Sequence, residues 1–179
     1  MKLKKVVVIG PESTGKSTLC EELADHFSTI WCPEYAREYL TKHGKNYVYD
    51  QLLTIAEKQV ALEDTFIQRA SNNNNDLLII DTDMYVMKVW CEYVFQKCHH
   101  QILEQISKRN YDLYLLCDVD LPWVSDALRE YPEDGPRREL FFIYKDLLIN
   151  QSVPFVIIHG DYSTRLQNAI AAVDKLFND

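Results

Sequence analysis

Residues 10–17, near the start of the chain, have the types and spacing of a loop that binds phosphate groups. They read GPESTGKS and match G-x-x-x-x-G-K-[ST] at all four specified positions. The two glycines allow several backbone N–H groups to point at one anion, and a helix that begins near the lysine adds its positive N-terminal end. We therefore expect a nucleotide triphosphate to be bound by Gly10, Glu12, Ser13, Thr14, Gly15, Lys16, Ser17 and Thr18.

Two side chains of this loop have separate chemical tasks. Lys16 is suited to reach the β- and γ-phosphates, and the Ser17 hydroxyl is suited to one coordination position on Mg²⁺. The alternative is a turn that binds nothing, but an apolar run at 6–9 precedes the motif and apolar residues follow at helical spacing over 19–27. The motif indicates nucleotide binding and leaves the reaction open.

Two carboxylates follow the apolar run at 77–80. Asp81 ends the expected strand, where it can hold Mg²⁺ directly or through water, and Asp83 can bind acceptor hydroxyls or act as a base. The alternative for each acid alone is a helix cap or a surface charge. Because the strand delivers both acids to the sheet edge that carries the phosphate loop, we favour a functional role for the pair.

Glu34 and Arg37 are three residues apart, so they share a face of a helical turn. One interpretation is a surface ion pair of little energetic value. The other is that Glu34 accepts a sugar hydroxyl or its proton while Arg37 contacts phosphate. The sequence leaves both open.

The segment 125–138 combines three arginines with two prolines and a glycine, a composition typical of a mobile lid. Its arginines, Arg129, Arg137 and Arg138, could close over the triphosphate and exclude water. Arg129 is the favoured contact because apolar residues over 123–128 can anchor its helix. A solvated basic loop is the alternative.

The elements that must position these residues follow from the hydrophobic pattern. We predict strands at 6–9, 29–32, 77–81, 113–117 and 155–158, with helices at 17–27, 34–40, 50–69 capped by Asp50, from 84 to beyond 106 with a break before 102, 140–149, and from 163 to about 177. This order predicts an α/β fold of the P-loop NTPase type, with a five-stranded, mostly parallel sheet between helical layers and an Arg-rich lid. Ligands are expected beyond the carboxyl ends of the strands, with residues 160–165 near an adenine ring.

Composition narrows the class of protein. A length of 179 residues suits one domain spanning 1–179, and a net charge of −8 disfavours a nucleic-acid partner. We find no apolar stretch of membrane-spanning length, and we expect no cleavable leader. Five cysteines without C-x-x-C spacing predict reduced thiols in a cytoplasmic protein. The sequence leaves open whether the chain forms a homo-oligomer.

Several blocks of the chain resemble the ribosylnicotinamide kinase domain of NadR-type proteins. The resemblance spans nearly the whole chain, and its most specific part is the second block together with the Asp-Thr-Asp triplet. The blocks are GPESTGKSTL at 10–19, PEYAREYL at 33–40, IAEKQ at 55–59, DTD at 81–83, Trp90, and YDLYLL at 111–116 with Pro122 and Trp123.

The resemblance implies ATP-dependent phosphorylation of the 5′-hydroxyl of nicotinamide riboside, with ATP and Mg²⁺ as cofactors. The pyridinium cation of that nucleoside favours aromatic faces and carboxylates, although core packing is the alternative for most of the aromatic candidates, which include Tyr39 and Tyr85. On this basis we assign catalysis to Lys16, Asp81, Asp83, Glu34 and Arg129, metal binding to Ser17 and Asp81, and substrate binding to Glu34, Tyr35, Arg37, Asp83, Trp90 and Trp123.

The chain also departs from the family. Its first predicted strand lies within the first ten residues, so we expect no nucleotidyltransferase domain before the kinase. The chain also has Met-Tyr-Val-Met at 84–87 where the family commonly has a threonine. Two other functions stay open. One is a deoxynucleoside or nucleoside monophosphate kinase, for which Arg37 is the strongest acceptor-side cation near the second strand; the other is a regulatory P-loop ATPase without a small-molecule acceptor. A GTPase is disfavoured because N-K-x-D and D-x-x-G motifs are absent.

Overall fold

A computed structural model describes residues 2–124 and 134–178. Its central sheet has five strands in the order β2-β3-β1-β4-β5, and every neighbouring pair is parallel. Parallel strands covered on both faces are apolar throughout, which explains the uninterrupted apolar runs in the sequence. The strands are β1 (Lys4–Ile9), β2 (Ile30–Cys32), β3 (Leu77–Asp81), β4 (Leu113–Cys117) and β5 (Phe155–Ile158).

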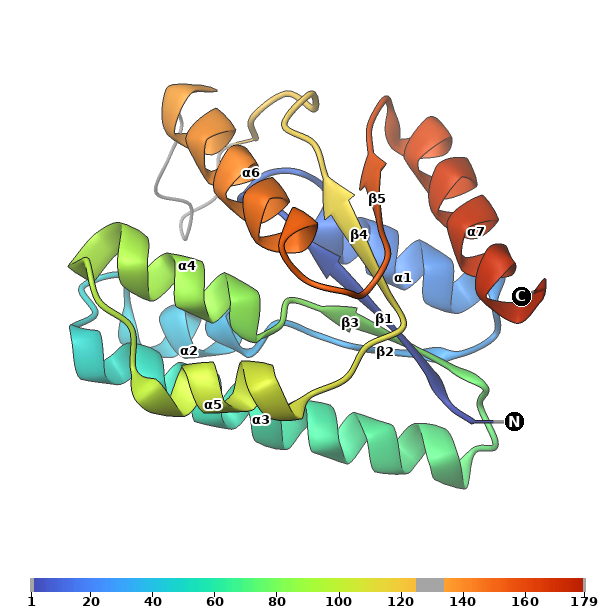
Figure 1. Ribbon diagram of the computed structural model, residues 1–179, viewed down its shortest axis with the longest axis horizontal. Helices are drawn as coiled ribbons and strands as arrows, with labels where there is room; N and C mark the ends of the chain where they lie inside the picture. The colour runs from blue at the N-terminus through green and yellow to red at the C-terminus, as the bar shows by residue number, and fades with distance from the viewer. Residues whose placement is uncertain (1, 125–133, 179) are drawn as a thin grey trace.

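Helices cover both faces of this sheet, so the predicted three-layer α/β/α architecture is confirmed (Figure 1). Helices α1 and α7 pack on one face, and α3, α4 and α6 pack on the other. The strand arrows point away from the side of the molecule where both chain termini lie. The helices are α1 (Lys16–His26), α2 (Tyr35–His43), α3 (Tyr49–Asn72), α4 (Met84–Phe95), α5 (His100–Lys108), α6 (Asp134–Ile149) and α7 (Tyr162–Asn178).

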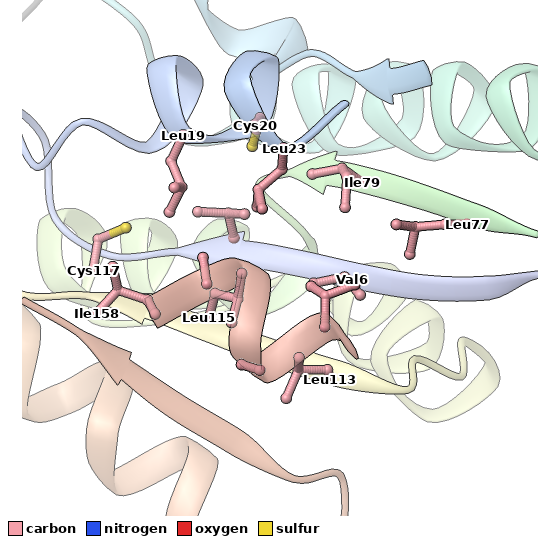
Figure 2. Packing of buried hydrophobic residues seen from close by; sticks show 14 residues of the cluster. Val6, Leu19, Cys20, Leu23, Leu77, Ile79, Leu113, Leu115, Cys117 and Ile158 are labelled. Carbon is pink, nitrogen blue, oxygen red and sulfur yellow. The ribbon is translucent and has the colours of Figure 1, made fainter. Parts of the chain in front are cut away.

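The core lies in two layers because alternate side chains of each strand point to opposite faces. Figure 2 shows one layer, in which Val6, Leu115 and Ile158 of the sheet pack with Leu19 and Leu23 of α1. Each fully buried side chain of this kind contributes about 1.5–3 kcal/mol. The packing fixes the strand ends, from which the polar residues of the site extend.

Several predicted boundaries differ from the structure, and two of the differences concern candidate residues. Residues 134–138, expected in the lid, form the start of α6, because proline is tolerated in a first helical turn that needs no N–H partner. Helix α3 begins at Tyr49, so Asp50 lies inside its first turn and Val48 is the N-cap residue, whose N–H donates to the Gln51 side chain at 2.8 Å. The predicted contact Arg129 lies outside the described residues.

Among helices within 2–124 and 134–178, none has the length and apolarity needed to cross a membrane. All five cysteines carry free thiols, and four of them are buried.

Candidate active site

A cleft of about 420 Å³ lies at the carboxyl ends of the central strands. All eight residues predicted to bind the triphosphate line it, together with Asp81 from the end of β3. The opposite wall comes from β2, from the segment after it and from α2, α4 and α6. It contains Trp31, Pro33, Glu34, Ala36, Arg37, Leu40, Val86, Val89, Trp90, Tyr93, Leu140 and Tyr144.

The phosphate loop keeps its shape through close backbone contacts. A Cβ atom at Gly10 would lie 2.7 Å from the Cys117 carbonyl oxygen, so β4 approaches too closely for any other residue. Gly15 has a φ of 76°, in the left-handed region that favours glycine, and directly precedes α1. The buried Thr14 hydroxyl donates to the Pro11 carbonyl at 2.8 Å. The result is a preformed concave backbone at a helix N-terminus, which is suited to bind an anion.

Lys16, Ser17 and Asp81 come together at this end of the cleft. The Ser17 hydroxyl donates to Asp81 Oδ2 at 2.6 Å, and Lys16 Nζ donates to the Pro11 carbonyl at 2.9 Å. Burial raises the pKa of Asp81, while the nearby Lys16 charge opposes that rise. A hydroxyl and a carboxylate are the hard oxygen donors that Mg²⁺ prefers, so this pair fits a magnesium ion.

Glu34 faces the cleft from the N-cap position of α2. Burial of its carboxyl group, together with the negative charge of Asp81, raises its pKa to about 6, and the positive charges of Lys16 and Arg37 act in the opposite direction. A carboxylate with a pKa near neutrality can exchange a proton with a hydroxyl group. Arg37 also lines the cleft, from the first turns of α2.

Asp83 lies outside the set of described residues that line the cleft. It is the N-cap residue of α4: Oδ1 accepts from the Tyr85 N–H at 2.9 Å, and Oδ2 accepts from the Tyr114 hydroxyl at 2.7 Å. Its exposure is 1%, and burial raises its pKa to about 7. Of the two interpretations left open by the sequence, its position supports the helix cap.

The aromatic residues of the cleft differ from those expected. Trp90 lines it as predicted, whereas Tyr35 packs against Tyr39 with ring centroids 6.4 Å apart and does not line the cleft. Tyr85 lies 5.8 Å from the Tyr114 ring. Trp123, which is half-buried, is also not part of the lining.

Three other aromatic side chains take their place: Trp31, Tyr93 and Tyr144. Trp31 precedes the segment that carries Glu34, and Tyr93 lies three residues after Trp90 on α4. Residues three apart share a helix face, so the assignment of Trp90 to the site could also have indicated Tyr93. Tyr144 could not be singled out, because α6 offers apolar residues in all directions and only tertiary packing selects one face.

Two buried arginines support the phosphate loop from behind, and sequence reasoning did not find these roles. Arg137 of α6 donates to the carbonyl oxygens of Ser13 at 3.3 Å and Leu121 at 3.4 Å. Arg165 of α7 donates to the Thr14 carbonyl at 2.9 Å and pairs with Asp120. Neither arginine lines the cleft, so both act on the loop backbone.

Comparison with protein families gives a match to the model described as "AAA domain" over residues 5–165. Two curated relatives are named "Trifunctional NAD biosynthesis/regulator protein NadR", from Escherichia coli (strain K12) and Salmonella typhimurium (strain LT2). Each is 26% identical over 178 residues, covering 99% of this chain and 43% of the relative. The chain therefore spans less than half the length of these relatives. The resemblance to NadR-type proteins seen in the sequence is confirmed.

Solved structures share the fold. A crystal structure of NadR protein in complex with NR aligns with a TM-score of 0.83 at 24% identity, covering 99% of this chain and 50% of that chain. A complex of NadR protein with NAD and AMP-PNP gives a TM-score of 0.77 at 24% identity with the same coverage. Thymidylate kinase from Ehrlichia chaffeensis gives 0.67 at 13% identity, covering 97% of this chain and all of that chain. The architecture is thus that of P-loop kinases.

Proposed function

This chain belongs to the AAA domain family, and from that premise we propose that it transfers the γ-phosphoryl group of ATP to a small nucleoside, specifically the 5′-hydroxyl of nicotinamide riboside. The observation that supports the proposal is that Lys16, Ser17, Asp81 and Glu34 line one cleft, in which we assign Glu34 to the acceptor. Phosphoryl transfer requires charge neutralisation, an aligned acceptor and exclusion of water, and these residues supply the first two.

The nucleotide end of the cleft has a defined task for each group. Backbone N–H groups of the phosphate loop bind the phosphates, and Lys16 neutralises charge on the transferred group. Ser17 and Asp81 would hold Mg²⁺, which when bound neutralises phosphate charge. The complex of a NadR protein with AMP-PNP supports ATP as the nucleotide.

Glu34 is our candidate for the general base. It lines the cleft, and its pKa of about 6 leaves it ionised at neutral pH and able to accept the proton of the attacking hydroxyl. Asp81 is engaged by Ser17, and Asp83 is engaged as the cap of α4. Arg37, on the same helix as Glu34, is placed to orient phosphate or acceptor oxygens.

The acceptor side supports an unphosphorylated nucleoside with an aromatic base. Trp31, Trp90, Tyr93 and Tyr144 provide aromatic surfaces, and the carboxylate of Glu34 favours a cationic ring such as pyridinium. Among the cleft-lining residues that the structure describes, Arg37 is the single cation besides Lys16, whereas a monophosphate acceptor favours several. The complex of a NadR protein with NR supports nicotinamide riboside.

The test is release of ADP from ATP and Mg²⁺ with nicotinamide riboside, pyrimidine nucleosides, nucleoside monophosphates or no acceptor. We expect nicotinamide riboside to stimulate release most strongly, and Lys16→Ala, which loses the phosphate-binding ammonium, to remove this stimulation while the protein stays folded. Stimulation by monophosphates alone would favour the monophosphate kinase. Equal ADP release with and without every acceptor would contradict a nucleoside kinase and support a regulatory ATPase.

A further inference from the structure

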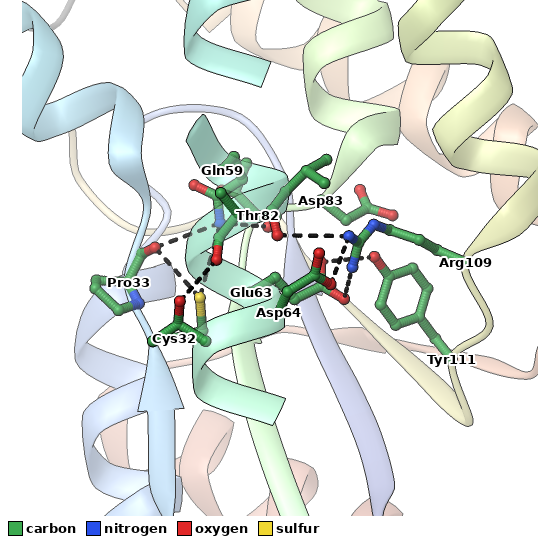
Figure 3. Close-up of polar contacts among 12 residues, drawn as sticks. Cys32, Pro33, Gln59, Glu63, Asp64, Thr82, Asp83, Arg109 and Tyr111 are labelled. Atoms are coloured by element: carbon green, nitrogen blue, oxygen red, sulfur yellow. Dashed lines mark hydrogen bonds and ion pairs between the residues drawn. The ribbon is translucent and has the colours of Figure 1, made fainter. Parts of the chain in front are cut away.

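Gln59 is a buried polar side chain in the middle of α3, with an exposure of 1%. Figure 3 shows its amide between Pro33, which follows β2, and Thr82, which follows β3. It does not belong to the described lining of the cleft. Because a buried amide is costly unless its hydrogen bonds are made, the identity of its partners reveals its task.

The main partners of Gln59 are backbone groups next to two strand ends, and its Nε2 also donates to the Cys32 sulfur at 3.9 Å. Its Oε1 accepts from the Tyr35 N–H at 2.7 Å, and its Nε2 donates to the carbonyl oxygens of Pro33 at 3.4 Å and Thr82 at 3.5 Å. A backbone N–H only donates and a carbonyl only accepts, so a single orientation of the amide satisfies all three. Its contacts therefore specify a glutamine rather than an apolar residue.

These backbone groups are next in the chain to the two acids of the candidate site, Glu34 and Asp81. The Pro33 carbonyl and the Tyr35 N–H belong to the two peptide groups on either side of Glu34. Thr82 directly follows Asp81 and has a φ of 74°, a conformation that a β-branched residue adopts only when its surroundings hold it. Gln59 thus joins the segment that carries Glu34 to the segment that carries Asp81.

We propose that Gln59 is a positioning residue for phosphoryl transfer: through these three hydrogen bonds it fixes Glu34 relative to Asp81 without touching substrate. The inference rests on the proposed function, in which Glu34 must meet the acceptor hydroxyl while Asp81 serves the nucleotide end. Small displacements of such groups have large effects on rate, because the reacting atoms must be held in line. The groups that face Glu34 are Asp81, Lys16 and Arg37.

The test compares Gln59→Met, which has similar volume and no amide, with Gln68→Met on the exposed side of the same helix. For Gln59→Met we expect kcat to fall about ten- to a hundredfold, while the KM for ATP changes less than about threefold, because the phosphate loop makes no hydrogen bond to Gln59. Gln59→Glu keeps an acceptor for Tyr35 but turns a carboxylate oxygen toward two carbonyl oxygens, so its loss should be at least as large. Gln68→Met should match the wild type. An unchanged kcat in Gln59→Met would overturn the inference.

A double variant tests whether the loss of kcat in Gln59→Met arises through Glu34 or independently of it. If Gln59 acts through Glu34, then Glu34→Gln combined with Gln59→Met should be no slower than Glu34→Gln alone. Multiplied losses would show that the two residues act independently, and would also overturn the inference.

Hydrogen exchange at the Tyr35 amide requires no substrate, so it tests the role of Gln59 independently of the proposed function. We expect Gln59→Met to accelerate exchange at this amide at least about tenfold, with amides of β1 unchanged. A wild type that phosphorylates no nucleoside would contradict the proposed function. The role of Gln59 would be rejected by a different result, unchanged exchange at the Tyr35 amide in Gln59→Met. Should Gln59→Met not fold, Gln59→Leu is used, and its exchange at Tyr35 is compared in the same way.

Discussion

The carboxylates of Asp81 and Asp83 do different work although both are buried and only two residues separate them. Asp81 accepts from the Ser17 hydroxyl inside the cleft, whereas Asp83 accepts from the Tyr85 N–H and the Tyr114 hydroxyl. Two such residues on one strand would share a face, but the strand ends at Asp81 and Thr82 turns the chain through a φ of 74°. The sequence predicts the acids; it does not predict that turn, because a threonine gives no signal for a left-handed conformation.

The cap role of Asp83 leads to a prediction that separates it from the cleft residues. Asp83→Asn keeps an oxygen for the α4 cap and a group for the Tyr114 hydroxyl, so we expect turnover within about threefold of the wild type. Asp83→Ala removes the acceptors for the Tyr85 N–H and the Tyr114 hydroxyl. It should lower the free energy of unfolding by about 2–4 kcal/mol, because the α4 cap is lost and a buried hydroxyl is left unpaired. Urea unfolding and steady-state turnover measure the two effects. A loss of turnover in Asp83→Asn comparable with that in Asp81→Asn would return Asp83 to the catalytic residues.

At the scale of elements, the phosphate loop depends on helices far away in the chain. Helices α6 and α7 each contribute one buried arginine, Arg137 and Arg165, whose guanidinium groups bind loop carbonyls from behind. Both lie in the first turns of their helices, and α6 follows β4 in the chain while α7 follows β5. The spacing of apolar residues was enough to predict which segments form helices and which form strands. The two arginines were not recognised as supports, because a charged residue in a helix is more often exposed than buried.

Removing one support should damage nucleotide binding without touching the cleft. In Arg165→Met, the Thr14 and Asp118 carbonyls and the Asp120 carboxylate lose their donor. We expect the free energy of unfolding to fall by about 1–3 kcal/mol, because buried carbonyl oxygens lose their donor, and ATP to bind about tenfold more weakly. Calorimetric titration with a non-hydrolysable ATP analogue and thermal unfolding provide the measurements. Lys175→Met, on an exposed position of the same helix, is the control. Unchanged affinity in Arg165→Met would mean that the loop keeps its shape without this support.

At the scale of the whole molecule, the parallel sheet brings three acids to one edge, where Asp81 and Asp83 are buried and Glu34 is half-buried. The order β2-β3-β1-β4-β5 sets the segment with Glu34 beside the end of β3 with Asp81 and Asp83. The layers and the edge that carries the site were predictable, since β-strands that alternate with helices form a parallel sheet whose carboxyl ends meet. The depth of burial was not predictable, because it depends on how α3, α4 and α6 close over this edge. That depth raises the pKa of all three acids.

Raised carboxyl pKa values make the stability of the unliganded protein depend on pH in a definite direction. Asp83, with a pKa of about 7, and Glu34, with a pKa of about 6, bind protons in the folded state at pH values where the unfolded chain has already released them. The folded state therefore binds more protons between about pH 4 and pH 7, and the free energy of unfolding should fall as pH rises through this range. For Asp83, which is almost fully buried, the effect is on the order of a few kcal/mol.

Urea unfolding of the unliganded protein at several pH values from 5 to 8 tests this expectation, with Asp83→Asn as the variant and Glu57→Gln, at an exposed position on α3, as the control. The amide in Asp83→Asn does not titrate, so its stability should fall less steeply with pH than that of the wild type, and the two curves should diverge most between pH 5 and pH 7. Glu57→Gln should follow the wild-type curve. Parallel curves for the wild type and Asp83→Asn would mean that the Asp83 carboxyl is ionised in the folded state throughout this range, and that the cap of α4 holds a charge rather than a proton.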